Sequence, residues 1–89
     1  MKVYKTTLKV TDRQVVMVPR GAKFLTAQIQ RGEPQLWFLC DEKEPITNRI
    51  IAIYGTGHPL PEDPGEYIST FQELGGDLIW HVFAIREGN

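Results

Sequence analysis

The sequence predicts an all-β domain, a small antiparallel sandwich or barrel of about seven strands. Apolar and polar residues alternate with period two in most segments, which is typical of half-buried strands. Turn residues recur about every 8–12 positions, as in small sandwiches. No window combines a helical apolar stripe with a cap at one end and a glycine stop at the other. The 89 residues leave room for one domain, spanning 1–89.

The first four strands are expected at residues 3–10, 14–18, 24–30 and 36–40. The first alternates polar and apolar residues, and the second is almost wholly apolar and therefore more deeply buried. The third alternates with Leu25 and Ile29 inward, and a glycine-containing loop at 31–34 turns the chain into the fourth. The polar segment 41–48, which holds Pro45, is expected to be an exposed connection.

The last three strands are expected at 50–54, 67–72 and 78–86, with Gly-Gly-Asp at 75–77 joining the final pair as a hairpin. Both faces of the last strand are partly apolar, so we expect it to be central in a sheet or at a subunit contact. The apolar faces of these segments predict the core. Its expected members are Leu25, Ile29, Leu36, Phe38, Ile51, Ile53, Phe71 and Phe83.

Composition excludes several classes of function. The chain is 42% hydrophobic with a net charge of -1, so no basic field attracts nucleic acid or a membrane surface. No apolar run approaches the roughly 18 residues of a membrane helix. The single cysteine, Cys40, excludes an intramolecular disulfide and a cysteine-based zinc cluster. We expect a cytoplasmic protein whose small size favours a homo-oligomer.

Catalytic constellations are lacking, and the chain is expected not to be an enzyme and to need no cofactor. Its two histidines, His58 and His81, have no second histidine at metal spacing, so no metal site is expected. Cys40 ends an apolar strand, where burial would make it inert. Ser69 lacks the strand–turn–helix context of a nucleophile elbow. His81 lies among apolar residues and is expected to be a core or interface histidine.

The segment from Tyr54 to Pro59 is the candidate binding loop, with Gly55, Thr56, Gly57 and His58 between them. One interpretation is a bulged turn whose glycines adopt positive φ and whose proline sets the exit. The other is a ligand loop, because glycines let backbone N–H groups approach an anion. Both interpretations stay open at the level of sequence.

Three further residues are candidates for the same site. Arg49 and Arg20 would supply the positive charge that an anionic ligand needs. Trp37 falls on the strand face opposite Leu36 and Phe38, so it points outward if that apolar face is the core, and either Trp37 or Tyr54 would then stack a base. Trp37 packed against a second sheet or in a subunit interface is the equal alternative.

Several motifs together carry a resemblance. They are Pro19-Arg20-Gly21-Ala22-Lys23, Gly32-Glu33-Pro34 with Leu36-Trp37, Ile53-Tyr54-Gly55-Thr56-Gly57-His58-Pro59, Tyr67-Ile68-Ser69-Thr70-Phe71-Gln72 and His81-Val82-Phe83. With the N-terminal Lys2-Val3-Tyr4-Lys5 they resemble a family of short uncharacterised proteins of tailed phages and prophages. The Tyr-Gly-Thr-Gly-His-Pro core is the most specific part. The resemblance implies a viral accessory role in the cytoplasm of a bacterial host and assigns no functional residues.

We therefore expect a non-enzymatic phage accessory binding protein. Its most concrete form is a homo-oligomer that sequesters a nucleotide-type immune signal as counter-defence. The alternatives are an inhibitor that binds a host defence protein through a sheet edge or apolar face, and a structural accessory of the virion.

Overall fold

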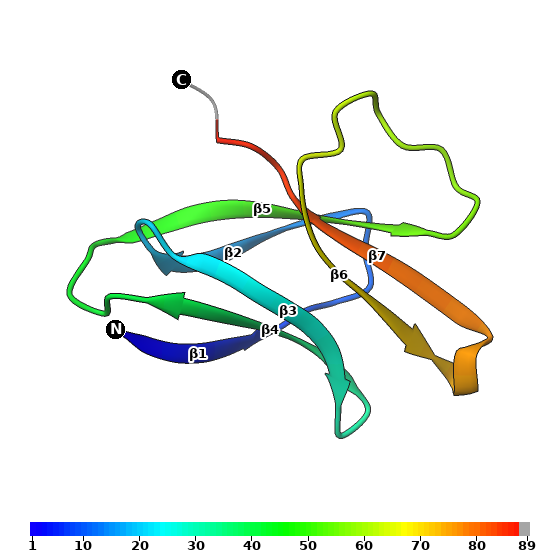
Figure 1. Ribbon diagram of the computed structural model, residues 1–89, viewed down its shortest axis with the longest axis horizontal. Helices are drawn as coiled ribbons and strands as arrows, with labels where there is room; N and C mark the ends of the chain where they lie inside the picture. The colour runs from blue at the N-terminus through cyan, green and yellow to red at the C-terminus, as the bar shows by residue number, and fades with distance from the viewer. Residues whose placement is uncertain (88–89) are drawn as a thin grey trace.

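Seven β-strands form two antiparallel sheets, which confirms the all-β prediction (Figure 1). The computed structural model describes residues 1–87. The strands are β1 (Lys2–Thr7), β2 (Arg13–Pro19), β3 (Lys23–Gln30), β4 (Glu33–Cys40), β5 (Ile46–Gly55), β6 (Glu66–Glu73) and β7 (Leu78–Ala84). Sheet order is β1-β4-β3 in one sheet and β2-β5-β7-β6 in the other. The last strand, β7, lies between β5 and β6, as its two partly apolar faces predicted.

The core lies between the two sheets. Five of the predicted core residues are buried there, namely Leu36, Phe38, Ile51, Ile53 and Phe71. A predicted sixth, Ile29, is half-buried and packs against them. Val16 and Val18 of β2 and Val82 of β7 complete the apolar layer. Period-two alternation on paired strands therefore places one row of side chains from each strand in a common interior.

Two predicted core residues are not buried. Leu25 is 42% exposed, because the pairing of β3 with β4 shifts between Phe24 and Thr26. This bulge resets the alternation, so that Phe24 and Ala27 both face inward. Phe83 is half-buried, because β7 turns Val82 and its other even-numbered residues toward the core. Both faces of β7 carry apolar residues, so alternation in the sequence does not show which face is the inner one.

One connection also differs from expectation. The segment 41–48 is only partly a connection, since β5 begins at Ile46 and pairs from there with Pro19 of β2. The predicted hairpin between the last two strands is confirmed, since β6 and β7 pair antiparallel, and its turn is a single 3₁₀ turn, η1 (Leu74–Gly76). Within residues 1–87 no helix has the length and apolar character needed to cross a membrane.

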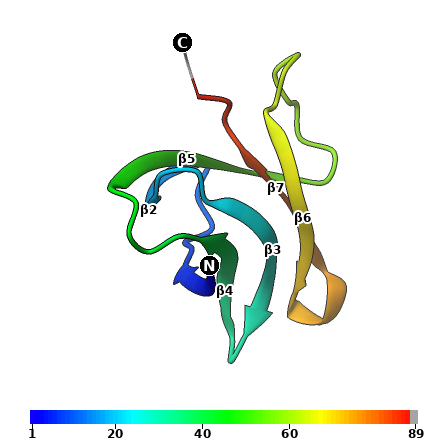
Figure 2. The ribbon, with the colours of Figure 1, turned by 60° about the vertical axis from the view of Figure 1, so that its left-hand side comes forward.

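A polar seam joins the two sheets along one side, where β3 and β6 lie next to each other (Figure 2). The buried hydroxyl of Ser69 donates to the carbonyl oxygen of Ala27 at 2.9 Å. The hydroxyl oxygen of Ser69 also lies 3.0 Å from the Thr26 hydroxyl and accepts a hydrogen bond from the Gln28 amide at 3.0 Å. Side chains thus link β3 to β6 and satisfy the buried hydroxyl, which would be costly to leave unpaired.

The burial of the aromatic residues yields a stability prediction. Phe71 is 1% exposed, so Phe71→Ala should lower the free energy of unfolding by about 3–5 kcal/mol through lost burial and a residual cavity. Phe83→Ala removes an equal volume from a half-buried position and should cost markedly less. Urea unfolding of the two variants beside the wild type measures the difference. Equal losses would contradict the assignment of Phe83 to the outer face.

Candidate functional site

The predicted loop is an ordered turn at the end of β5. The N–H of His58 donates to the carbonyl of Gly55 at 3.1 Å, which closes the turn. Gly57 occupies its third position with φ 86°, a conformation that glycine adopts without steric cost. The N–H of Thr56 donates to Ile79 of β7 at 3.2 Å and ties the turn to the sheet. The turn therefore presents Thr56, Gly57 and His58 to solvent from a fixed frame.

Gly55 permits a close approach within this turn. A Cβ atom there would lie 3.0 Å from two atoms of the His58 ring and 3.2 Å from Cζ3 of Trp80. The imidazole of His58 therefore folds back over Gly55 toward Trp80. The indole N–H of Trp80 donates to Glu73 at 2.7 Å, which orients that ring in turn. A side chain at position 55 would displace His58.

Thr56 begins a chain of side-chain hydrogen bonds across the outer face of the four-stranded sheet. Its hydroxyl lies 2.7 Å from Nε2 of His81. The other ring nitrogen of His81, Nδ1, lies 3.1 Å from the hydroxyl of Thr70, which lies 2.8 Å from the hydroxyl of Tyr67. Loop, β7 and β6 are thus linked through one imidazole. Sequence reasoning placed His81 in a core or interface, and the structure places it half-buried on this outer face.

Aromatic rings pack beside this chain. The ring of Phe83 meets Tyr54 edge-on at a centroid distance of 5.8 Å and Tyr67 at 5.6 Å. Such edge-to-face pairs are a favoured geometry for aromatic rings. We call Tyr54, Thr56, Tyr67, Thr70, His81 and Phe83 together the aromatic–hydroxyl face. The strand register explains it, since Tyr54 and Thr70 both stand opposite His81 on neighbouring strands.

Two hollows flank His58. One, of about 380 Å³, is lined by Asp12, Arg13, Ile53, Tyr54, His58, Pro59 and Pro61. The other, of about 200 Å³, is lined by Gly55, Thr56, His58, Asp77, Leu78, Ile79 and Trp80. The first is bordered by Arg13 of β2, Tyr54 of β5 and His58 of the turn. We call it the Arg13 pocket.

Arg13 is the residue of this pocket that sequence reasoning missed. The sequence places Arg13 next to Asp12 in the turn before the second predicted strand, and no motif there indicates a binding residue. The pairing of β2 with β5 sets Arg13 opposite Ala52, two residues before Tyr54. Only this register brings a cation to the candidate loop.

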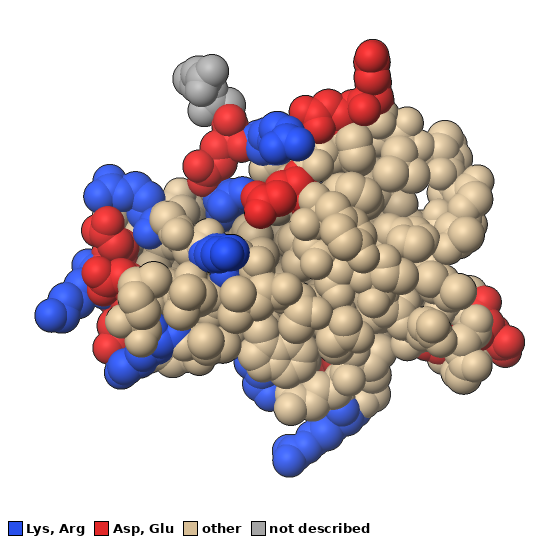
Figure 3. Space-filling model, in the orientation of Figure 1, with Lys and Arg blue, Asp and Glu red and all other residues tan. Residues whose placement is uncertain are grey.

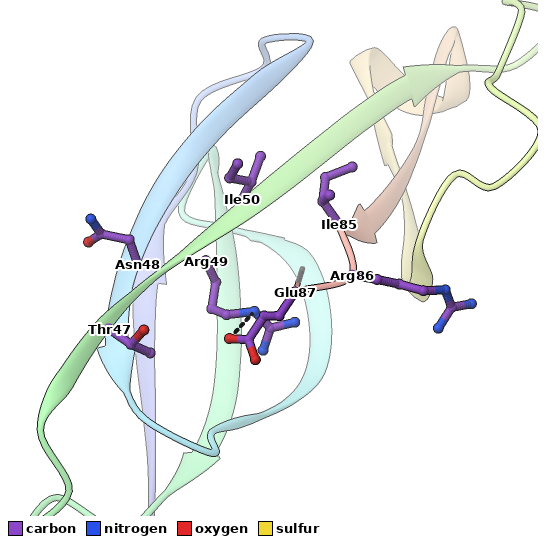
Figure 4. Close-up of a pocket in the computed structure, with 7 residues that line it drawn as sticks. All are labelled: Thr47, Asn48, Arg49, Ile50, Ile85, Arg86 and Glu87. Carbon is purple, nitrogen blue, oxygen red and sulfur yellow. Dashed lines mark ion pairs between the residues drawn. The ribbon is translucent and has the colours of Figure 1, made fainter. Parts of the chain in front are cut away.

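The structure does not bring the other predicted cations to the loop. Arg49 lies at the opposite end of β5 with a side chain that is 13% exposed, and its guanidinium sits 5.1 Å above the Phe24 ring. Its Nε is 3.2 Å from Oε1 of Glu87, without a well-directed hydrogen bond (Figure 4). Figure 4 also shows Arg49 and Ile50 on opposite sides of β5, around a hollow of about 340 Å³. Arg20 pairs instead with Glu44 at 3.6 Å.

Trp37 is also remote from the loop by topology. It lies on β4 in the other sheet, opposite Lys5 and Thr26, between the buried Leu36 and Phe38. Trp37 therefore lies on the outer face of its sheet, as expected, and its side chain is half-buried there. Of the sequence-predicted site residues, the structure gathers Tyr54, Gly55, Thr56, Gly57 and His58, and separates Arg20, Trp37 and Arg49 from them.

Charge is distributed unevenly over the surface. On the face seen in Figure 3, charged side chains lie mostly toward the left, upper and lower margins, with acidic groups at the right margin, and the area over β6 and β7 is largely uncharged. An ion pair lies beside β1, where the ammonium group of Lys2 is 2.8 Å from the carboxylate of Glu42. This hydrogen bond raises the pKa of Lys2 and lowers the pKa of Glu42. The hydrogen bond of Tyr4 to the same carboxylate raises the pKa of Tyr4.

Residues 1–87 contain no cluster of three or more histidine, cysteine or carboxylate side chains that could hold a metal ion. The side chain of His58 has no hydrogen-bond partner within the same residues. The hydrogen-bonded imidazole of the site is that of His81, which lies between the hydroxyls of Thr56 and Thr70.

The whole chain, residues 1–89, matches the model of a protein family described as a domain of unknown function (DUF7352), and the chain belongs to this family. No characterised protein and no solved structure was found to be similar to it.

The hydrogen-bond chain through His81 yields a second prediction. Thr70→Val removes the partner of Nδ1 and of the Tyr67 hydroxyl at a partly buried position, and should destabilise the fold by about 1 kcal/mol. Thr56→Val removes the exposed partner of Nε2, which water replaces, and should cost less. Urea unfolding of both variants measures the order. A larger loss for Thr56→Val would contradict it.

Proposed function

We propose that this domain is a non-enzymatic binding protein that captures a small anionic ligand of the nucleotide type in the Arg13 pocket. One observation carries the proposal: Arg13, Tyr54 and His58 line a single hollow of about 380 Å³. That volume falls within the range of small-molecule sites, about 300–1,000 Å³.

The three side chains fit the parts of a nucleotide. The guanidinium of Arg13 is a planar fork that holds phosphate oxygens in pairs. The phenol ring of Tyr54 offers a stacking surface for a base. Its edge-to-face contact with Phe83 limits the ring's motion, so that little entropy is lost when a base stacks on it.

The turn supplies further polar groups. The imidazole of His58 and the backbone of Gly57 face solvent from a closed turn that Pro59 follows. Asp12 also lines the pocket and would repel a bare phosphate. Carboxylates accept hydrogen bonds from ribose hydroxyls in dinucleotide sites, so Asp12 favours a ligand with a free ribose hydroxyl. The pocket chemistry thus fits a nucleoside phosphate better than inorganic phosphate.

Binding is favoured over catalysis by the surroundings of His58, the histidine that lines the pocket. His58 has no carboxylate or nucleophile hydrogen-bonded to its ring within residues 1–87. A general base is normally oriented by such a partner.

The resemblance to short tailed-phage proteins gives the proposal a biological setting. In the cytoplasm of an infected bacterium, a domain with this pocket would sequester a nucleotide immune signal and blunt host defence. Capture without turnover needs stoichiometric amounts of protein, which suits a small domain of 89 residues.

Calorimetry with ADP-ribose, AMP, cyclic dinucleotides and inorganic phosphate tests the proposal. We expect at least one nucleotide to bind and phosphate to bind far more weakly. Arg13→Ala should weaken binding tenfold or more, since a charge-assisted contact is lost (about 1.4 kcal/mol per factor of ten). Lys23→Ala is the matched control, because it removes an exposed positive charge from the other sheet and should leave affinity unchanged.

Two results would contradict the proposal. If folded wild-type protein binds no member of the panel, the nucleotide-binding function is wrong and a host protein or virion partner takes its place. If Arg13→Ala binds as tightly as the wild type, the ligand lies elsewhere.

A further inference from the structure

A second feature concerns the open edges of the sheets, and it does not depend on any ligand. Two sheets have four edge strands, here β1, β3, β2 and β6. The seam at Ser69 covers the adjacent edges of β3 and β6. The edges of β1 and β2 pair with no other strand in residues 1–87. Unpaired edges are templates for pairing with another chain unless charges, prolines or bulges protect them.

The edge of β1 is protected. Lys2 and Lys5 lie on this six-residue strand, where lysines discourage strand pairing. Lys2 is fixed by the carboxylate of Glu42, and Tyr4 donates to the same carboxylate at 2.7 Å. Lys5 contacts Gln30. A strand added to β1 would have to approach along this row of charged side chains.

The edge of β2 carries protection only at its ends, where Arg13 begins the strand and Pro19 ends it. Residues 14–18 between them read Gln-Val-Val-Met-Val and include no charge, proline or glycine. Val15 and Met17 are 59% and 68% exposed. An exposed apolar edge of this length is expected to find a partner.

Hydrogen bonding defines which backbone groups of β2 are available. Ile53 donates to the carbonyl of Asp12 at 3.2 Å, and Arg20 donates to Pro45 at 2.8 Å, so even-numbered residues of this segment face β5. Neighbouring residues of a strand point their N–H and C=O groups to opposite sides. Arg13, Val15 and Met17 therefore direct theirs to the open edge, and only the Arg13 carbonyl has another partner, the Thr11 hydroxyl at 3.2 Å.

We propose that two copies of this chain pair through β2, antiparallel about a two-fold axis at Val15, and join their four-stranded sheets into one continuous sheet. The occupant of the edge is a second copy because β2 is complementary to itself in this register. Val15 faces Val15 of the partner subunit, and Arg13 faces Met17 of the partner subunit. All three residues that direct backbone groups outward then stand opposite residues that also direct theirs outward.

Side chains agree with this register. Arg13, Val15 and Met17 project from the outer side of the sheet, since Val16 and Val18 point to the core. In the dimer no like charges stand opposite each other, because Arg13 faces a methionine of the partner. Ile50, which is 41% exposed and stands opposite Val15 on β5, continues the apolar stripe from β2 into the sheet. The pairing thus removes exposed apolar area from both copies while it satisfies the open backbone groups.

Molecular mass in solution tests the pairing. We expect the wild type at micromolar concentration to show twice the chain mass of 10.2 kDa by native mass spectrometry or light scattering. Val15→Lys places a charge at the proposed interface between the two β2 strands and should give the monomer mass. Val3→Lys is the matched control, since Val3 is a similarly exposed valine (55%) on the protected edge of β1, and should stay dimeric. Unchanged circular dichroism shows that each variant is folded.

Cross-linking gives an independent measurement of the register. Hydrogen-bonded antiparallel residues have Cα atoms about 5.5 Å apart, within the range that a disulfide spans. Val15→Cys should therefore form a covalent dimer on mild oxidation. Wild type and Val3→Cys should not form one, because Cys40 is fully buried and Val3 lies away from the proposed β2 interface.

A monomeric wild type, a dimer that survives Val15→Lys, or a Val15→Cys protein that resists cross-linking would each overturn the pairing. None of these results depends on nucleotide binding, so failure here and failure of the proposed function are distinguishable.

Discussion

Packing of two small sheets through one shared apolar layer is the constraint on which the rest of the structure depends. Leu36, Ile51 and Phe71 reach this layer from both sheets and are almost fully buried. A chain of 89 residues buries little surface, so each strand must commit one whole face to the interior. Ser69 fixes how the sheets meet along one side, because its buried hydroxyl is satisfied only when β3 and β6 lie together. Once the inner faces are committed, the outer faces and edges are the surfaces left for recognition.

The outer face of the four-stranded sheet is unusual in combining rings with a hydrogen-bonded hydroxyl chain. His81 links Thr56 of the loop to Thr70 of β6, and Phe83 supports the rings of Tyr54 and Tyr67. These contacts hold the loop against the sheet, so its exposed groups are presented in one arrangement. Pre-organisation of this kind lowers the entropic cost of binding. The same contacts hold the His81 imidazole in one orientation between two hydroxyls.

Arg13 belongs both to the Arg13 pocket and to the open edge of β2. Arg13 begins β2, lines the pocket beside Tyr54, and turns its backbone toward the unpaired edge. Pairing of two copies through β2 would place each Arg13 pocket close to the interface between the two copies. Ligand capture and assembly are separate properties of the molecule, yet both follow from the position of this strand at the border of the sheet.

The sequence by itself determined the all-β class, six of the seven strands to within a few residues at each end, and the turn at Gly55–His58, because period-two alternation and glycine–proline punctuation are local signals. It could not determine which face of β7 is inner, since His81 and Phe83 alternate with Val82 and other apolar residues. It also missed the bulge after Phe24, which exposes Leu25. Strand register decided which arginine lies near the loop. Pairing of β2 with β5 brought Arg13 to the loop, and the position of Arg49 on the inner side of β5 turned its charge toward Phe24 and Glu87. Contacts between residues distant in the chain depend on pairing that no single segment encodes.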